Sequence, residues 1–276
     1  MKKLLFGTAG IPISTAPRTT ENGIERVKEL GLNAMELEFV RGVYLSKEKA
    51  KEIKKIAKEN NVVLTSHAPY YINLNSNEKQ KIGASRSRII KAAEIANLCG
   101  GWSVCFHAGF YMKNNPEEVY SQIKTQIIKI SEELKKKKNN IWIRPETTGK
   151  QTQFGSLNEI LDLSQEIDNV MPCVDFSHIH ERTNKYNSYN EFCKILETIE
   201  KKLGKKGLTN MHMHVSGIDY SEKGERKHLT LENSDFKYKE LLKALKKFNV
   251  KGVLISESPN IEKDAILMKN YFKELK

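Results

Sequence analysis

The sequence has no long apolar run. No stretch of it approaches the roughly 20 consecutive apolar residues that a membrane helix needs, so we expect no membrane partner. The first residues carry two lysines and reach Gly7 before an apolar core of signal-peptide length can form. We therefore interpret this segment as a first strand and expect a cytoplasmic protein.

Cysteines are few as well. Only four occur, and no two are spaced as C-x-x-C, which argues against a zinc ribbon. Their spacing and the expected compartment also argue against disulfide bonds. We predict that all of them pack as small buried side chains: Cys99, Cys105, Cys173 and Cys193.

Acidic residues are outnumbered by basic ones, 34 to 46, which leaves a formal net charge of +12. An excess of this size raises the local concentration of polyanions and suits a nucleic-acid partner. Some of the lysines stand in runs, such as residues 135–138, that are typical of solvated helix ends. The charge is therefore compatible with DNA binding but does not identify it.

Short β-rich runs alternate with segments of 3.6-residue apolar spacing. The predicted strands are residues 3–8, 34–39, 62–67, 102–107, 141–146, 171–175, 210–215 and 252–257. Strands and helices in this alternation predict a (β/α)8 TIM barrel, an α/β fold, as a single domain over residues 1–276. A doubly wound open sheet is the alternative, but residues 7–10 are too short for a glycine-rich phosphate fingerprint.

Side chains suited to metal binding stand at or near the ends of the predicted strands. In a barrel the carboxyl ends of the strands converge on one face, where active sites form. Imidazole nitrogens and carboxylate oxygens are the ligands that zinc and similar divalent ions take. The residues in question are His67, His107, Glu146, Asp175, His214 and Glu257.

The distribution of histidines supports the same site. All seven fall at or just after predicted strand ends, and none falls in a predicted helix: His67, His107, His178, His180, His212, His214 and His228. This supply exceeds the three protein ligands of a typical catalytic zinc, which predicts a cluster of two or three ions. Such a cluster can clamp both oxygens of a phosphoryl displacement and lower the pKa of a bound water.

Six motifs stand in order along the third to eighth predicted strands. Residues 67–74 read H-A-P-Y-Y-I-N-L, residues 106–109 read F-H-A-G, and residues 146–155 hold a glutamate followed by two glycines. Residues 175–178 read D-F-S-H, His214 lies on the seventh strand, and residues 257–259 read E-S-P. Together these motifs resemble those of the endonuclease IV family of abasic-site endonucleases, which are xylose isomerase-like barrels. One H-x-G alone would be unspecific, whereas six ordered matches are specific.

The resemblance implies two or three zinc ions, with manganese as the alternative metal. It assigns ligands in three groups: His67, His107 and Glu146 for the first ion; Glu146, Asp175, His214 and Glu257 for the second; His178, with Glu225 and His228, for the third. It also implies hydrolysis of the phosphodiester on the 5′ side of abasic sites in double-stranded DNA, in base-excision repair. Glu146 would be the catalytic residue because it helps to hold or deprotonate the attacking water. We expect the protein to act as a monomer.

The third group departs from the family pattern. The family has D-x-H where this chain has Glu225, Arg226, Lys227 and His228. Glu225 can replace an aspartate as an oxygen ligand, but a protonated Lys227 has no lone pair to offer a metal. We predict that His228 takes the place of the missing histidine. A local turn would bring Glu225 and His228 to one ion, whereas a regular extended chain would direct them to opposite sides.

Two residues are predicted to contact DNA. Arg41 lies in the loop after the second strand, from which the family inserts side chains into the duplex, and Tyr70 matches a family tyrosine. An arginine there can contact phosphate or fill the gap at a missing base, and an aromatic ring can stack on exposed bases. The alternative is that Arg41 pairs with Glu38 and that Tyr70 packs on the rim.

Two further histidines have open roles. His212 shares a strand face with His214, so it could orient a metal ligand from behind. His180 is either an alternative to His178 or a loop residue without a role at the site.

Two other functions remain open. A sugar isomerase or epimerase of the xylose isomerase-like barrels would also place His, Glu and Asp at strand ends, around manganese or magnesium. A catalytically decayed protein that only binds DNA lesions is the second. The charge, the Arg41 and Tyr70 loops and the histidine supply favour the nuclease over a sugar enzyme, and the intact first and second ligand groups favour it over a lesion binder.

Overall fold

The structure is a computed structural model that describes residues 1–221 and 224–275, with the backbone alone at 220, 221 and 224–226. Eight parallel strands form one sheet in the order β6-β4-β3-β2-β1-β12-β9-β8. These strands are β1 (Leu4–Ala9), β2 (Ala34–Glu38), β3 (Val63–His67), β4 (Ser103–Phe106), β6 (Trp142–Pro145), β8 (Cys173–Asp175), β9 (Met211–Val215) and β12 (Gly252–Ser256). Each lies within two residues of its predicted range.

The first and last strands of this order, β6 and β8, also meet. Two parallel bridges join them, Ile143 to Val170 and Glu146 to Cys173. The amide of Thr147 donates to the carbonyl of Cys173 at 3.1 Å on the same seam. The sheet therefore closes into a TIM barrel, as predicted, and the doubly wound open sheet is excluded.

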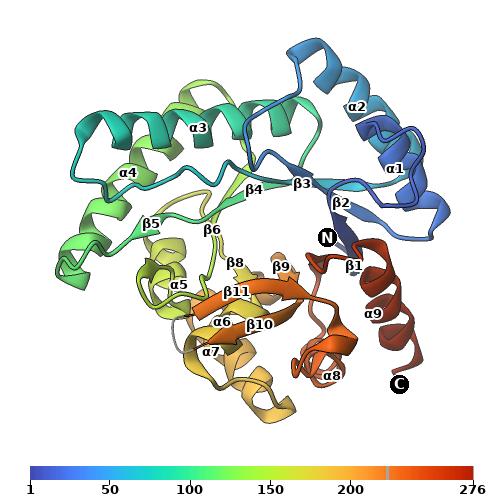
Figure 1. The fold of residues 1–276 in the computed structure, drawn as a ribbon. Helices are drawn as coiled ribbons and strands as arrows, with labels where there is room; N and C mark the ends of the chain where they lie inside the picture. The colour runs from blue at the N-terminus through green and yellow to red at the C-terminus, as the bar shows by residue number, and fades with distance from the viewer. Residues whose placement is uncertain (222–223, 276) are drawn as a thin grey trace.

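Helices surround the barrel as an outer ring, and the two termini lie near each other beside β1 and α9 (Figure 1). The helices are α1 (Thr20–Glu29), α2 (Lys47–Asn60), α3 (Lys79–Leu98), α4 (Pro116–Lys136), α5 (Leu157–Glu166), α6 (Phe176–Thr183), α7 (Tyr189–Thr209), α8 (Tyr238–Lys247) and α9 (Glu262–Glu274). Within the part of the chain that the structure describes, none of them is long and apolar enough to cross a bilayer.

Capping residues in the sequence account for several helix ends. The Ser156 hydroxyl accepts from the amide of Glu159, whose carboxylate accepts from the amide of Ser156, which is a capping box at the start of α5. Gly31 and Gly100 follow α1 and α3 with φ of 71° and 73°, a left-handed conformation that glycine adopts without a Cβ clash.

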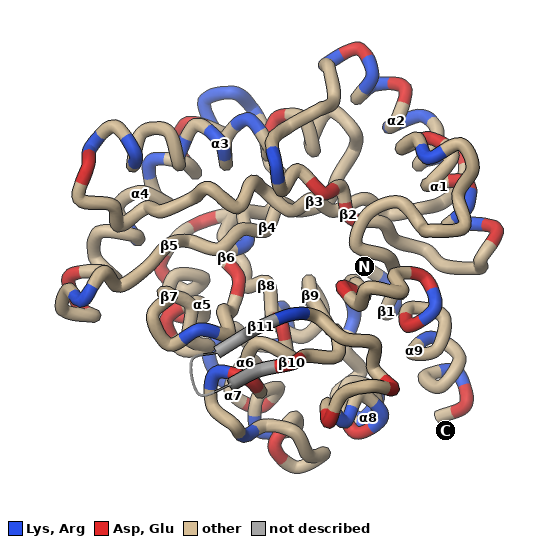
Figure 2. The backbone as a smooth tube through the Cα atoms, in the orientation of Figure 1, with Lys and Arg blue, Asp and Glu red and all other residues tan. Residues whose placement is uncertain are grey.

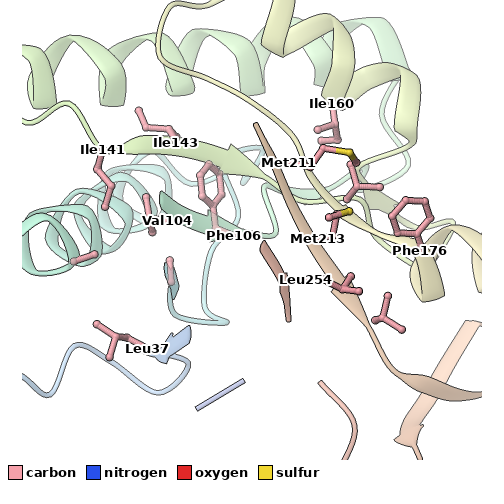
Figure 3. Close-up of a cluster of buried hydrophobic side chains, with 14 of the residues drawn as sticks. Leu37, Val104, Phe106, Ile141, Ile143, Ile160, Phe176, Met211, Met213 and Leu254 are labelled. Atoms are coloured by element: carbon pink, nitrogen blue, oxygen red, sulfur yellow. The ribbon is translucent and has the colours of Figure 1, made fainter. Parts of the chain in front are cut away.

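Side chains alternate between the two faces of the barrel wall. Outward-facing residues such as Val104, Phe106, Met211 and Met213 pack against the helices in the main hydrophobic core (Figure 3). Inward-facing residues are of two kinds. A small apolar group includes Ala34, Val253 and Ile255, and ionisable side chains fill the region towards the carboxyl ends of the strands.

Several short elements were not expected from the sequence. The chain after β9 forms a hairpin of β10 (Gly217–Ser221) and β11 (Gly224–Leu229), followed by the short helix η1 (Leu231–Asn233). Two short strands, β5 (Gly109–Phe110) and β7 (Gln153–Phe154), pair in the loops after β4 and β6. Helix α6 begins directly after β8 and carries His178 and His180, so the prediction that no histidine lies in a helix is wrong.

The positive charge is spread over the molecule. Lys and Arg occur on helices all around the outer ring rather than on one of them (Figure 2). The four cysteines are free and buried, as predicted.

Candidate metal centre

Glu146 is the centre of a buried polar cluster at the carboxyl ends of the strands. Its Oε2 lies 3.2 Å from His67 Nε2 and 3.4 Å from His107 Nε2. Its Oε1 lies 3.2 Å from His214 Nδ1 and 3.5 Å from His178 Nδ1. Burial alone would raise the pKa of Glu146, but His214 and His107 hold it well below its usual range. Glu146 is thus an ionised carboxylate enclosed by four imidazoles.

A second group combines Glu146 with residues at the carboxyl ends of β8, β9 and β12. Glu146, Asp175, His214 and Glu257 each offer one ligand atom, and these atoms all lie within 4.8 Å of one another. His214 Nδ1 is 3.2 Å from Glu257 Oε1. Three carboxylates around one imidazole give an oxygen-rich donor set that a divalent cation can take.

Asp175 serves the fold and the cluster with different atoms. Its Oδ1 accepts from the amide of His178 at 2.8 Å and caps the N-terminus of α6. Its Oδ2 is buried and has no hydrogen-bond partner among the described residues, and the same is true of Glu146 Oε2. Buried carboxylate oxygens without donors are costly, so these two atoms are oriented as metal ligands would be.

Backbone carbonyls fix the rings of three histidines. The Nδ1–H of His67 donates to the carbonyl of Ala68 at 2.7 Å, and that of His178 to Thr147 at 3.0 Å. The Nδ1–H of His228 donates to the carbonyl of Glu257 at 3.0 Å. A ring that donates from Nδ1 keeps its Nε2 lone pair for a metal, and such donors are the usual support of ligating histidines.

The field inside the cluster attracts positive charge. Burial would lower the pKa of His67, but Glu146 and the more distant Glu38 and Glu36 raise it to about 10. The same carboxylates that hold a proton on His67 would favour a divalent cation in its place. Donor types, unpartnered oxygens and charge therefore all fit a metal centre.

The third predicted group is partly assembled. His107, Glu146 and His178 place ligand atoms within 4.8 Å of one another, and the ring of His228 lies 6.2 Å from that of His178. Lys227 is exposed. The side chain of Glu225 lies outside the described residues, so its role as a ligand stays a prediction.

The backbone of the β10–β11 hairpin bears on the pairing of residues 225 and 228. The chain there is extended, but the register shifts so that residue 228 opposes 218, 227 opposes 219, and 225 opposes 220. Residue 226 is the extra residue of a β-bulge. Positions 225 and 228 therefore oppose residues two apart on β10, which in a strand belong to one face. A β-bulge, rather than the local turn that was predicted, therefore places positions 225 and 228 on the same face of the hairpin.

Sequence reasoning missed Glu36 and Glu38, which β2 directs into the barrel. Burial and the charge of Glu36 raise the pKa of Glu38 to about 8. Burial would also raise the pKa of Glu36, but His214 and His212 hold it well below its usual range. The signal was present, because M-E-L-E on β2 alternates in the same way as M-H-M-H on β9.

Beneath the centre lies a second layer of buried polar groups. Cys105, Cys173, His212 and His214 bring their ligand atoms within 4.8 Å of one another. Burial raises the pKa of the Cys105 thiol well above its usual range. The prediction that the cysteines are buried is correct, but Cys105 contacts polar groups, with its Sγ 3.4 Å from the carbonyl of Ser66.

The predicted DNA contacts are exposed, and His180 lies apart from the cluster. Arg41 is exposed in the loop between β2 and α2. Tyr70 is 64% exposed, and its ring lies 5.9 Å from that of His67 in an edge contact, so it stands on the rim of the centre. His180 is a structural residue, since its Nδ1–H donates to the carbonyl of Lys185 and its Nε2 lies 3.2 Å from Asp235 Oδ2.

Comparison with known proteins places the chain in a family. The model of the xylose isomerase-like TIM barrel family matches residues 24–275. An uncharacterized protein of Methanocaldococcus jannaschii is 46% identical over 99% of this chain and 98% of its own length. A probable endonuclease 4 of Aster yellows witches'-broom phytoplasma is 29% identical over 61% of this chain and 59% of its own length.

Solved structures agree on the fold. Endonuclease IV from Thermus thermophilus has a TM-score of 0.72 at 18% identity and covers 97% of this chain and 100% of its own. A D-tagatose 3-epimerase-like protein has a TM-score of 0.72 at 21% identity and covers 97% and 96%. At these identities the likeness is one of fold. The chain belongs to the xylose isomerase-like TIM barrel family.

Proposed function

We propose that this protein is a zinc-dependent endonuclease that hydrolyses the DNA phosphodiester on the 5′ side of abasic sites. The observation that carries the proposal is the set of imidazoles from His67, His107 and His178 around Glu146. They add nitrogen donors to a group of four that could already hold one ion. A site for more than one ion suits phosphodiester hydrolysis, in which both the attacking and the leaving oxygen need a cation.

The residues of the chain have separate tasks in this proposal. Glu146 joins the two ligand groups and, as an ionised carboxylate, would accept a proton from the attacking water. The first zinc ion would be held by His67, His107 and Glu146. The second would be held by Glu146 together with Asp175, His214 and Glu257. The third would be held by His178, His228 and Glu225. Zinc bound there would activate water near neutral pH and neutralise charge on the phosphate. Manganese, which prefers oxygen ligands, would suit the carboxylate-rich group of Glu146, Asp175, His214 and Glu257.

Exposed aromatic and apolar side chains in the loops after β3 and β4 support a nucleic-acid substrate, and one of them, Tyr70, contacts His67 of the centre. Tyr70 and Tyr71, in the loop after β3, are 64% and 71% exposed. Phe110 and Met112, in the loop after β4, are 38% and 48% exposed. Aromatic rings beside a polar centre can stack on unpaired bases, and with Arg41 they would hold the strand at an abasic site.

The decisive experiment is incubation of purified protein with a duplex that carries one tetrahydrofuran abasic analogue. We expect a single cut on the 5′ side of the analogue, which prolonged chelator treatment abolishes and added zinc restores. An undamaged duplex of the same sequence is the control. Absence of a cut by zinc-loaded protein would refute the proposal, and binding of abasic duplex without a cut would indicate the decayed lesion binder.

Removal of the rim side chains should weaken recognition more than chemistry. Stacking on an aromatic side chain is worth about 1–3 kcal/mol, so Tyr70→Ala should lower affinity for abasic duplex by about 5- to 150-fold. Arg41→Ala should add to this loss, while kcat falls less. Fluorescence anisotropy with abasic and intact duplexes measures the effect, and Lys135→Ala, in the lysine run of α4, is the control. Equal losses on both duplexes would show that the two residues do not read the lesion.

A sugar epimerase or isomerase is the second candidate. The group of Glu146, Asp175, His214 and Glu257 is complete without the three extra imidazoles, and one divalent ion in it would suffice for such chemistry. One manganese per chain, with no incision of abasic duplex, would favour this candidate. For either activity we propose a single-domain, monomeric protein of the cytoplasm.

A further inference from the structure

His214 is supported differently from the other histidines of the centre. The rings of His67, His178 and His228 are held by backbone carbonyls at Nδ1. His214 instead directs Nδ1 towards Glu146 and Glu257, each at 3.2 Å. Its Nε2 faces the interior of the barrel, where it lies 2.9 Å from Glu36 Oε1. A side chain, not the backbone, therefore meets the second nitrogen of this ring.

Glu36 is itself held by a chain of buried contacts. Its Oε2 lies 3.0 Å from His212 Nε2, and His212 Nδ1 lies 3.0 Å from the Ser103 hydroxyl. All four side chains, including His214, are fully buried. Neither Glu36 Oε1 nor His212 Nε2 makes a hydrogen bond to a described residue, so the approaches of the two imidazoles to Glu36 are close ion-pair contacts. The contacts run without a break from Ser103 on β4 to the metal centre.

A buried carboxylate at position 36 is unexpected, because burial of a charge costs free energy unless the charge is paired. An apolar residue would suit the interior of a barrel better, as Val253 and Ile255 do on β12 in register with His212 and His214. A carboxylate accepts a hydrogen bond from one nitrogen of an imidazole and so selects one tautomer of the ring. The nitrogen on the other side of the ring then becomes a stronger metal ligand.

We propose that Glu36 is the positioning residue of His214. In this role Glu36 accepts from the Nε2–H of the His214 ring, which leaves the Nδ1 lone pair directed at the metal shared with Glu146 and Glu257. His212 and Ser103 hold Glu36 in place. The proposal rests on the function above only in naming the metal centre, since its consequence is a change in metal binding. Loss of a partner of this kind lowers metal affinity by about 10- to 100-fold.

Cys105 and Cys173 suggest the competing arrangement. Their thiols lie with His212 and His214 in a group whose ligand atoms are within 4.8 Å of one another. An ion at that place would make His212 and His214 ligands through their inward nitrogens, and Glu36 would then be a neighbour of an interior ion. The two arrangements differ in an observable way, because only the second one predicts metal–thiolate bonds.

The test compares two substitutions with matched steric size. Glu36→Leu removes both acceptor oxygens, whereas Glu36→Gln keeps one carbonyl oxygen that can accept from His214. We expect zinc affinity, measured by competition with a chromophoric chelator, to fall by about 10- to 100-fold in Glu36→Leu and by less in Glu36→Gln. Metal content per chain after dialysis should follow the same order. If Glu36 acts as an acceptor, Glu36→Gln should bind zinc more tightly than Glu36→Leu. If Glu36 only fills space, the two variants should bind zinc equally.

Glu262→Gln is the control. Glu262 is another buried carboxylate, and it accepts from the amides of Ile13 and Ser14 outside the centre. Its substitution should change the melting temperature and leave zinc affinity unchanged. Should Glu36→Leu fail to fold, zinc affinity in Glu36→Gln decides alone, and a value equal to that of the wild type overturns the proposal.

Cobalt substitution gives the second readout. We expect the ligand-field spectrum of the cobalt-loaded protein to change in Glu36→Gln and to lack thiolate charge-transfer absorption. Such absorption, if lost in Cys105→Ser, would overturn the proposal in favour of an interior ion. A wild-type protein that binds zinc but leaves abasic DNA intact would refute the endonuclease and leave the inference about Glu36 standing.

Discussion

Glu146→Gln should lower the rate of abasic-site incision by about 10²–10³-fold or more, the range for loss of one group that stabilises charge in a transition state. The carboxylate is fully buried and lies within 3.5 Å of four imidazole nitrogens, so no neighbouring group can replace it. Glutamine keeps the shape of the side chain but removes the charge and presents an NH2 group to nitrogens that should face a cation. Zinc content should fall together with activity, because both ligand groups include Glu146.

The measurement is incision of abasic duplex under single-turnover conditions, together with zinc content and thermal unfolding. Glu132→Gln, an exposed glutamate on α4, serves as the matched control and should behave as the wild type. A folded Glu146→Gln protein that still cuts at a near-normal rate would exclude Glu146 as the catalytic residue. Loss of zinc with full retention of activity would exclude the metal centre itself.

Arg144→Leu should cost about 2–6 kcal/mol of unfolding free energy, because it leaves two buried backbone carbonyls without a donor. Arg144 is fully buried, although burial lowers its pKa to about 9. Its guanidinium donates to the carbonyls of Pro172 and Asn210 at 2.8 and 3.0 Å and stacks 4.4 Å from the ring of Trp102. Leucine leaves those buried carbonyls without a donor, which costs about 1–3 kcal/mol for each group.

Urea denaturation followed by circular dichroism measures this loss as a lower midpoint at an unchanged slope. Arg88→Leu is the control, since Arg88 also donates to a backbone carbonyl, that of Tyr71, but does so in solvent. Its substitution should change stability by about 0.5 kcal/mol or less. Equal effects of the two substitutions would show that the buried network contributes nothing beyond a surface hydrogen bond.

The strands could be predicted from the sequence because their pattern is local. A central barrel strand faces helices on one side and the interior on the other, so apolar and polar residues alternate, as in M-H-M-H on β9. Helix α6 was missed because it is short and starts directly from Asp175, which had been assigned to the strand and the metal. Because the prediction lacks α6, it assigns His178 and His180 to a loop.

The ligand types and their place at the strand ends were therefore determined by the sequence itself, which specifies periodicity and residue chemistry. The choice of which ring nitrogen faces the centre, the use of Asp175 as both cap and candidate ligand, and the contact of Glu36 with His214 were decided only by the tertiary structure. The physical reason is barrel closure, because the stagger of the strands brings the side chains at positions 36 and 146 each to about 3 Å from His214, through contacts that no local pattern encodes.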